Sequence, residues 1–312
     1  MTARIGYLLP TREAIMEGRP EAEPLLGLAE RAEQLGYDSV WIGDSLLARP
    51  RHEPLTLLAG VAGRTRRVKL GTAVLLPALR NPVLLAHQVA TLDQVSTGRV
   101  ILGIGIASDV PNVRAEFRSA GVPFEKRVGT LMECMALCKA LWKGNPVDWD
   151  GRWQVEQGVI GPTPHQPGGP PIWGGGSAPA ALERVGRHFD GWFPTGPGSK
   201  RWGEQWRQVQ AIARDAGRKP EVLEAAVYLT LAVDEDSVKA EQRINHFLSA
   251  YYGQRPEVLK QRLACFSGSA GAAMEWLNGY VQEGAQTLVL RFAGDHERHL
   301  DTIAKLRGTL AA

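Results

Sequence analysis

The sequence predicts an α/β protein, a single (β/α)8 TIM barrel with insertions, and three observations favour this fold. Residues 69–105 contain an apolar strand over Leu70–Leu76, a helix over Pro82–Val95 and a second apolar strand over Val100–Ile104. The strands lack polar alternation, which is typical of parallel strands buried on both faces. The same pattern recurs until eight apolar segments alternate with helices, and 312 residues that are 44% hydrophobic suffice for one large core.

The expected strands are short apolar runs, each bounded by turn residues or by the start of a helix. In chain order they are Arg4–Pro10, Asp38–Gly43, Leu70–Leu76, Val100–Ile104, Pro171–Gly175, Gly191–Pro194, Ala225–Val233 and Thr287–Phe292. Right-handed crossovers leave two arrangements for such units, a closed barrel and an open doubly wound sheet. The number of strands favours the barrel.

The expected helices carry apolar residues at helical spacing, and the first of them stops at Gly36, a typical C-terminal residue. In chain order they are Glu21–Gly36, Glu53–Arg66, Pro82–Val95, Glu125–Lys143, Ala178–Arg187, Lys200–Ala216, Asp236–Tyr252, Ala270–Glu283 and Asp295–Leu306. Three connections are too long for ordinary loops and are interpreted as insertions, at about 106–124, 147–170 and 253–269. The second insertion looks like a short hairpin followed by a Pro-rich return. The whole chain, 1–312, is therefore interpreted as one domain.

Composition restricts the partners. The formal net charge of +3 is close to balanced, so neither nucleic acid nor a membrane is expected as a partner. The apolar run at the N-terminus is short for a signal peptide, and no stretch approaches the length of a transmembrane helix, so a cytoplasmic location is expected. Cys134 and Cys138 lie four residues apart, but they lack further ligands at metal-binding spacing, and no metal is expected.

The segment around the first βαβ unit resembles the signature of the bacterial luciferase-like family of flavin and deazaflavin (F420) dependent oxidoreductases. The matching residues read GTAVLLP from Gly71, NP from Asn81, LA from Leu85 and LDQVSTGRVILGIG from Leu92. The order of elements fits this family over nearly the whole chain. The resemblance implies a TIM barrel that binds a flavin-type cofactor, and family members are commonly dimers.

The resemblance also implies roles for residues near the cofactor ring. Ala73–Val74 matches a step where family members often carry a cis peptide that supports the ring, and Asp44 matches an acidic residue that helps to hold a deazaflavin. The chain departs from the family in two places. Ser45 stands where a histidine often follows that acid, which argues against the best-known alcohol-oxidising F420 mechanism. Ile106 stands where luciferase has an arginine that grips the FMN phosphate.

Gly174, Gly175, Gly176 and Ser177 are the clearest signal for a ligand. They connect a strand to a helix, Ser177 is a typical N-cap, and a helix start offers free N–H groups to a phosphate. A plain tight turn is the alternative, and with the resemblance phosphate binding is favoured. The residues after strand four, Gly103–Ser108, lack the third glycine of a dinucleotide-binding fingerprint.

Other candidates follow from the rule that a barrel's active site lies at the C-terminal ends of its strands. The catalytic candidates are Asp44, Ser45 and Arg291. The cofactor-binding candidates are Asp44, Ala73, Val74, Gly105, Gly174, Gly175, Gly176 and Ser177, and the substrate-binding candidates are Thr11, His52 and Arg80. A surface position is the alternative for His52 and Arg80. Basic residues such as Arg49 and Arg51 either form a positive rim around the active face or are scattered surface charge, and the second interpretation is slightly preferred.

The leading functional hypothesis is an FMN-dependent monooxygenase that uses O2 and reduced FMN supplied by a flavin reductase to oxidise a small organic substrate. The alternative is hydride transfer with F420, as a reductase or dehydrogenase. A third hypothesis is a barrel that binds a flavin without turnover. The expected partners are a small-molecule substrate, a flavin reductase and a second copy of the chain in a homodimer.

Overall fold

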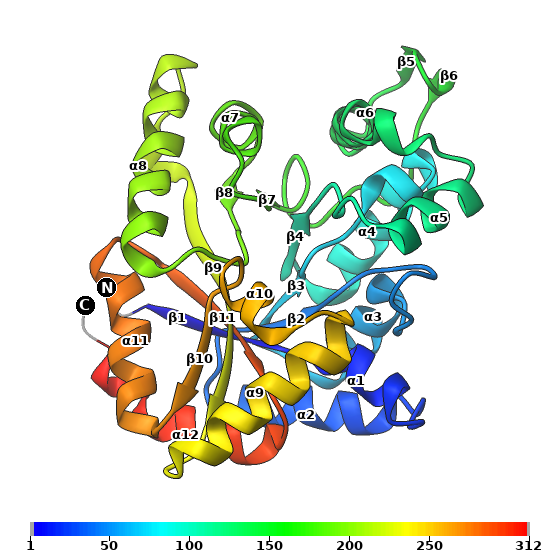
Figure 1. Ribbon diagram of the computed structural model, residues 1–312. Helices are drawn as coiled ribbons and strands as arrows, with labels where there is room; N and C mark the ends of the chain where they lie inside the picture. The colour runs from blue at the N-terminus through cyan, green and yellow to red at the C-terminus, as the bar shows by residue number, and fades with distance from the viewer. Residues whose placement is uncertain (1–2, 311–312) are drawn as a thin grey trace.

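The computed structural model describes residues 3–310 and shows a closed parallel barrel (Figure 1). Neighbouring strands follow the order β11, β1, β2, β3, β4, β7, β8, β9, and pairing of β9 with both β8 and β11 closes the ring. The bounds are Arg4–Leu8 for β1, Ser39–Ile42 for β2, Lys69–Thr72 for β3, Val100–Ile104 for β4, Ile172–Gly174 for β7, Gly191–Trp192 for β8, Glu224–Val233 for β9 and Thr287–Phe292 for β11. The predicted (β/α)8 fold is thus confirmed, and the open sheet is excluded.

Helices surround the barrel, and the expected ones are present with boundaries shifted by a few residues. Their bounds are Glu23–Gln34 for α2, Pro54–Arg64 for α3, Pro82–Ser96 for α4, Arg127–Leu141 for α6, Pro179–His188 for α7, Ser199–Asp215 for α8, Ser237–Tyr252 for α9, Ala270–Gln282 for α11 and His296–Leu306 for α12. A short helix after β1, α1 (Thr11–Met16), was not predicted. It places a turn of helix at the C-terminal end of the barrel.

The three insertions have structures of their own. The first contains α5 (Pro111–Ser119), and the second is the expected hairpin, formed by β5 (Val147–Asp150) and β6 (Gln154–Gly158). The third contains α10 (Pro256–Lys260) and β10 (Cys265–Gly268), which adds a strand beside the end of β9. The sequence prediction of a loop there missed β10, because its four residues include glycine, serine and only two apolar side chains.

The interior of the barrel is filled by aromatic rings. The Trp41 ring lies 5.2 Å from Trp173 and 4.9 Å from Phe193, measured between centroids. Glycines on the neighbouring strands leave room for Trp41: a Cβ at Gly6 would lie 2.5 Å from its Nε1, and one at Gly71 would overlap its ring. These rings form a solid floor, so a ligand can lie only above them, at the C-terminal ends of the strands.

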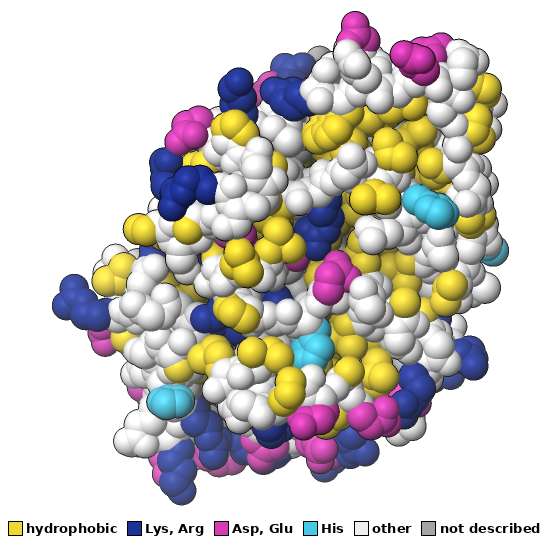
Figure 2. Space-filling view, turned by 90° about the vertical axis from the view of Figure 1, so that its right-hand side faces the viewer, with side chains coloured by type: hydrophobic (Ala, Val, Ile, Leu, Met, Phe, Trp, Pro, Cys, Tyr) yellow, Lys and Arg dark blue, Asp and Glu magenta, His cyan; other side chains and the backbone are white. Residues whose placement is uncertain are grey.

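One outer face shows no dominant charge. Figure 2 shows hydrophobic side chains exposed over its upper part, and acidic and basic side chains mixed along its lower edge. This mixture agrees with the formal net charge of +3. Among the described residues, none of the helices combines the length and the apolar character needed to cross a membrane.

Candidate active site

The C-terminal ends of the strands form a mouth above the aromatic floor, and Arg291 is the charged residue that rises directly from the barrel interior. Arg291 pairs in register with Thr230 on β9, and its Nε and Nη2 donate to the Thr230 hydroxyl at 3.2 and 2.8 Å. Only 2% of Arg291 is exposed. The Arg291 side chain therefore points toward the mouth, as one of the two possible phases of the strand predicts.

The peptide between Ala73 and Val74 is cis, as the family resemblance implies. It follows the end of β3, so the expected strand to Leu76 is interrupted by a bulge, after which Leu75 pairs with Ile104 of β4. Gly105 accommodates the resulting bulge, since a Cβ at Gly105 would lie 2.6 Å from Val74 Cγ2. Gly175 lies on the other side of the same valine, because a Cβ built there would lie 3.8 Å from Val74 Cγ1. Three of the predicted cofactor-binding positions thus meet at one place.

The loop Gly174–Ser177 is held by hydrogen bonds from surrounding side chains. Trp192 Nε1 donates to the Gly176 carbonyl at 2.8 Å, and Gln205 Nε2 donates to the Ser177 carbonyl at 2.9 Å. The amide nitrogens of Gly176 and Ser177 have no hydrogen-bond partner within residues 3–310. The loop therefore has its carbonyls bound and two of its N–H groups free, an arrangement that suits an anion.

The predicted N-cap role of Ser177 is wrong. Its hydroxyl donates to the Gly196 carbonyl at 3.2 Å, and the N-cap of α7 is Ala178, which forms no side-chain cap. The serine is drawn to the loop after β8, one residue before the helix begins. The start of α7 thus remains uncapped, with exposed residues Ala178–Ala180.

Asp44 and Arg80, predicted on separate grounds to contact ligands, contact each other. Arg80 Nη1 and Nη2 donate to the Asp44 carboxylate at 2.5 and 3.0 Å, and the Leu76 amide donates to the same carboxylate at 2.9 Å. The Asp44 side chain is 1% exposed. Arg80 also contacts Glu53 at 3.2 Å. This buried pair fixes the loop after β3 to the end of β2, and its charges compensate each other.

Ser45 also takes part in loop contacts. Its hydroxyl donates to Glu116 Oε1 at 2.7 Å and accepts from the Arg49 amide at 2.9 Å. The same Glu116 oxygen accepts from the Leu47 and Ala48 amides, so this buried carboxylate from α5 organises residues 45–49. Ser45 is thus part of the loop support and is not turned to the mouth.

The substrate candidates Thr11 and His52 have structural surroundings. Thr11 is the first residue of α1 and is 2% exposed. His52 Nε2 lies 2.9 Å from the Pro20 carbonyl, which requires the proton on Nε2 and links two surface loops. Neither side chain lies beside Arg291, whereas Arg12, the residue after Thr11, shares the Tyr251 ring with it.

A cluster of arginines around one tyrosine ring was missed in the sequence. The guanidinium carbons of Arg12, Arg51 and Arg291 lie 4.9, 5.8 and 4.8 Å from the centroid of Tyr251, which is near the end of α9. The Arg291 guanidinium also lies over Tyr228 and Tyr252, at 5.1 and 5.4 Å. We call Arg12, Arg51, Arg291 and Tyr251 the arginine cluster. No sequence signal links residues so far apart, although Arg12 does follow the first strand closely.

Glu13 is the carboxylate beside this cluster. Burial raises the pKa of Glu13 above its usual range, although Arg291, Arg51 and Arg12 act in the opposite direction. Its Oε1 is buried and has no hydrogen-bond partner within the described residues. A carboxyl group whose acid form persists to higher pH, at the edge of a mouth, is a candidate for proton transfer.

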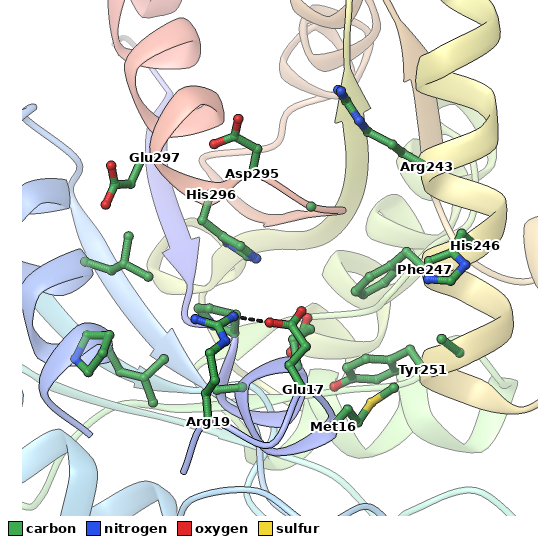
Figure 3. Close-up of a pocket in the computed structure, with 18 of the residues that line it drawn as sticks. Met16, Glu17, Arg19, Arg243, His246, Phe247, Tyr251, Asp295, His296 and Glu297 are labelled. Carbon is green, nitrogen blue, oxygen red and sulfur yellow. Dashed lines mark hydrogen bonds and ion pairs between the residues drawn. The ribbon is translucent and has the colours of Figure 1, made fainter. Parts of the chain in front are cut away.

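A cleft of about 1180 Å³ lies between α1 and α2 on one side and α9 and the start of α12 on the other. Figure 3 shows Phe247 and Tyr251 on its α9 side, facing Met16 and Glu17 of the α1 region. Glu13 and Tyr251 line it, whereas Arg12, Arg51 and Arg291 do not, so the cleft reaches the arginine cluster at its tyrosine. Its lining includes none of Gly174–Ser177, which lie across the barrel.

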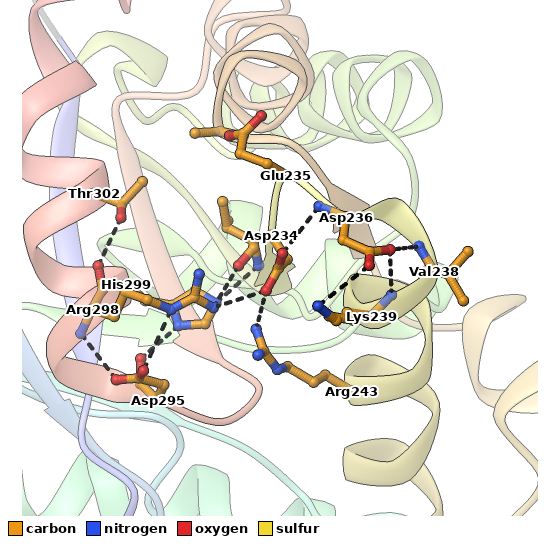
Figure 4. Close-up of polar contacts among 12 residues, drawn as sticks. Asp234, Glu235, Asp236, Val238, Lys239, Arg243, Asp295, Arg298, His299 and Thr302 are labelled. Atoms are coloured by element: carbon orange, nitrogen blue, oxygen red, sulfur yellow. Dashed lines mark hydrogen bonds and ion pairs between the residues drawn. The ribbon is translucent and has the colours of Figure 1, made fainter.

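The position of α9 is fixed by a polar network at its N-terminal end (Figure 4). Asp234 follows β9, accepts from Arg243 of α9 at 2.7 Å and lies 3.6 Å from Arg298 of α12. His299 Nε2 accepts from the Val233 amide at 2.9 Å, so its Nδ1 carries the proton donated to the Asp295 carbonyl. These contacts tie α9 to β9 and α12. They set the helix direction that brings Tyr251 over the mouth.

Within residues 3–310, no group of three or more His, Cys, Asp or Glu side chains is arranged to hold a metal ion. Cys138, one of the two cysteines four residues apart, donates its thiol to the Pro82 carbonyl at 3.3 Å. The described mouth thus offers a glycine loop with free amides, a cis peptide beside it, and an opposite wall of arginines and tyrosines. The free amides of the glycine loop are suited to an anionic group.

Comparison with known proteins identifies the family. The sequence model of the family "luciferase-like monooxygenase" matches residues 3–312, so the chain belongs to this family and is a luciferase-like oxidoreductase. A 5,10-methylenetetrahydromethanopterin reductase of Methanolobus tindarius is 30% identical over 266 residues, covering 84% of this chain and 77% of that protein. An F420-dependent glucose-6-phosphate dehydrogenase of Amycolatopsis mediterranei is 32% identical over 317 residues, covering 91% and 94%.

Solved structures share the fold. An F420-dependent secondary alcohol dehydrogenase, solved with an F420-acetone adduct, superposes with a TM-score of 0.84 over all of both chains at 19% identity. A monooxygenase from Streptomyces bottropensis gives a TM-score of 0.81 over 99% of this chain and 100% of that chain, at 23% identity. These likenesses support the TIM barrel alone. FMN, expected as the cofactor, has no support among the relatives at 30% identity or more that are described above, and the alternative, F420, is favoured.

Proposed function

We propose that the chain is an F420-dependent oxidoreductase that transfers a hydride between the deazaflavin and a small organic substrate. The observation that carries this proposal is the F420-dependent relative at 32% identity that spans nearly the whole chain. The monooxygenase described above resembles this chain at 23% identity, through the fold, so the FMN-dependent monooxygenase hypothesis gives way to F420-dependent hydride transfer. The quoted relatives act on different substrates, and their names do not identify this chain's substrate.

The residues at the mouth fit a cofactor that carries a phosphate. The free amides of Gly176 and Ser177, together with the uncapped start of α7, would hold the phosphate. A Cβ at Gly175 would meet its nearest atoms only at 3.4 Å or more, which is ordinary van der Waals contact. Val74 and Gly105 meet Gly175 there, and the bulge at the cis peptide would support the ring.

F420, when bound, supplies a ring carbon that accepts or donates a hydride. The chain must then hold the substrate, exclude water and move a proton to or from the substrate's oxygen or nitrogen atom. We assign the proton transfer to Glu13, because its acid form is favoured by burial and one of its oxygens has no partner. Asp44 and Ser45 are occupied by loop contacts, so we assign them a supporting role.

The test is a fluorescence titration of the purified protein with F420 and, separately, with FMN, followed by oxygen uptake with reduced FMN. We expect F420 to bind, FMN to bind at least tenfold more weakly, and no oxygen uptake above the background of free reduced FMN. Tight FMN binding with oxygen uptake would restore the monooxygenase hypothesis. F420 binding without turnover of any substrate in a screen of alcohols, aldehydes and imines would instead support a non-catalytic flavin-binding barrel.

The role of Glu13 is tested by the pH dependence of kcat in the Glu13→Gln variant. We expect kcat to fall at least a hundredfold and the wild-type inflection assigned to this carboxyl to disappear. Glu125→Gln is the matched control, since Glu125 is an exposed residue paired with Arg114, away from the mouth. An unchanged pH profile in Glu13→Gln would refute the assignment. A homodimer and a flavin reductase as partner stay predictions.

A further inference from the structure

The arginine cluster has more positive charge than the protein compensates. Its guanidinium groups surround the Tyr251 ring within 6 Å. None of the three arginines forms an ion pair with a carboxylate of residues 3–310. Glu13 is the carboxylate that acts on all three, and its single charge, even when ionised, leaves a net charge of two. Buried cations are normally paired with anions, so this cluster lacks a counter-ion.

Hydrogen bonds within the cluster are incomplete as well. Arg12 Nε and Nη1 are buried and have no hydrogen-bond partner in the described chain, and the same holds for Glu13 Oε1. Arg51 donates its Nε to the Arg49 carbonyl at 3.1 Å, and its Nη1 occupies the space where a side chain on Gly43 would stand. Burial lowers the pKa of Arg12, and Arg51 and Arg49 add to this effect by repulsion. An anion at this place would bind the free donors and remove the repulsion at once.

We propose that Arg12, Arg51 and Arg291 bind an anionic group of the substrate, a phosphate or a pair of carboxylates, so that the substrate is an organic anion. This inference rests on the proposed function. Guanidinium groups match phosphate and carboxylate geometry, and two net positive charges suit a group with about two negative charges. The substrate's reacting carbon would then lie between this anchor and the glycine loop.

The place of the cluster in the ring favours the substrate over the cofactor as the source of the anion. Arg12 and Arg291 follow or end β1 and β11, whereas the glycine loop follows β7, which lies four strands away from β1 around the eight-stranded ring. F420 carries its glutamate tail beyond its phosphate, on the side away from the ring. With the cofactor's phosphate at the glycine loop, an anion on the opposite wall of the barrel belongs to the substrate, which approaches the deazaflavin ring from the other side.

The cleft beside the cluster gives such a molecule a route. Tyr251 of the cluster and the adjacent Glu13 both line this cleft. Charges of both signs line its walls, and Figure 3 shows Arg19 and Arg243 together with Glu17, Asp295 and Glu297 there.

The experiment measures binding of inorganic phosphate and of citrate to the full-length protein by titration calorimetry, at constant ionic strength set with sodium chloride. We expect both anions to bind the wild type, and Arg12→Gln and Arg51→Gln each to weaken binding at least tenfold. Arg114→Gln is the matched control, because Arg114 is paired with Asp109 and Glu125 on the outside. Circular dichroism checks the fold of each variant. Lack of binding to the wild type, or equal affinity in Arg12→Gln and Arg51→Gln, would overturn the proposal.

A second measurement distinguishes the sources of the anion and does not depend on variants. F420 without glutamates and F420 with several glutamates are titrated into the wild type, with and without saturating phosphate. If the substrate supplies the anion, phosphate changes the affinity of both forms by the same factor, because any competition at the glycine loop is common to both. If phosphate weakens only the long-tailed form, the cluster binds the cofactor's tail, and the assignment to the substrate is wrong. A protein that binds phosphate but neither form of F420 would refute the proposed cofactor and retain the anion site.

Discussion

Replacement of Gly175 by aspartate tests whether the glycine loop holds the cofactor's phosphate. A Cβ fits at this position, because the nearest atoms are the Ile104 carbonyl oxygen at 3.4 Å, the Phe193 carbonyl oxygen at 3.5 Å and Val74 Cγ1 at 3.8 Å. Gly175 is also absent from the glycines with positive φ, so an L-residue is not strained there. We therefore expect the variant to fold and to lose affinity through charge.

The size of the effect follows from electrostatics. Two unit negative charges about 5 Å apart, at an effective dielectric constant of about 20, repel each other by about 3 kcal/mol. Exposure to solvent and salt reduces this value, and about 2–3 kcal/mol corresponds to an F420 dissociation constant raised about 30- to 150-fold. Higher salt should shrink the loss, because the two charges are partly screened.

The assay is a fluorescence titration of F420 into the wild type and three variants, Gly175→Ala, Gly175→Asn and Gly175→Asp. Asparagine has nearly the shape of aspartate without its charge, so the difference between these two variants isolates the electrostatic effect. We expect alanine and asparagine to change the dissociation constant by less than about fivefold, since only van der Waals contacts change. Equal affinities for the asparagine and aspartate variants would show that no phosphate lies beside Gly175.

Three further predictions concern stability and pH. Gly71→Ala should destabilise the protein by about 1–3 kcal/mol in urea unfolding, because its Cβ would overlap the Trp41 indole in the barrel floor. Gly63→Ala, at a helical position with open space around it, should stabilise the protein by about 0.5–1 kcal/mol. Equal effects of the two substitutions would contradict the packing argument. Arg80→Gln should cost about 3–5 kcal/mol because it leaves the Asp44 carboxylate buried without its partner, and a loss below 1 kcal/mol would show that this carboxylate is solvated. Burial lowers the pKa of His296 to about 3, so its neutral form stabilises the fold above the unfolded value of about 6.5, and this contribution is lost as the pH falls toward 3. As the pH falls from 6.5 to 5, the free energy of unfolding of His296→Gln should therefore rise by about 2 kcal/mol relative to that of the wild type. The same pH dependence in both proteins would refute this.

The fold was predictable because parallel strands need uninterrupted apolar runs, and each run in this chain is bounded by glycine, proline or a helix start. Elements without such a run were missed, namely α1 after the first strand and β10 (CFSG). The position of Arg291 could be predicted from strand phase. The cis peptide at Ala73–Val74 came from family resemblance, since backbone isomers leave no trace in composition or periodicity.

The candidate site was less predictable, because pairing between distant side chains decides which charges remain free. Asp44 and Arg80 are 36 residues apart, and each was a reasonable ligand-binding residue until the other was found beside it. Conversely, the sequence left Arg51 open as part of a positive rim or, with slight preference, as scattered surface charge. Arg51 approaches Tyr251, which is 200 residues later in the chain, only because α9 runs in the direction that it does. The bond between Arg243 and Asp234, toward the other end of α9, helps to set that direction.

The paired residues explain how the free ones reach the mouth. Asp44 holds the end of β2 to the loop after β3, and Glu116 holds residues 45–49 through Ser45 and two backbone amides. The segment that Asp44 and Glu116 hold precedes Arg51 by a few residues. The Arg51 guanidinium lies over Gly43, where a side chain at position 43 would block it. The acid and the serine that sequence reasoning assigned to chemistry thus position a cation instead. In the proposed anion site, the charge that faces the substrate would thus come from Arg51, the residue that they orient.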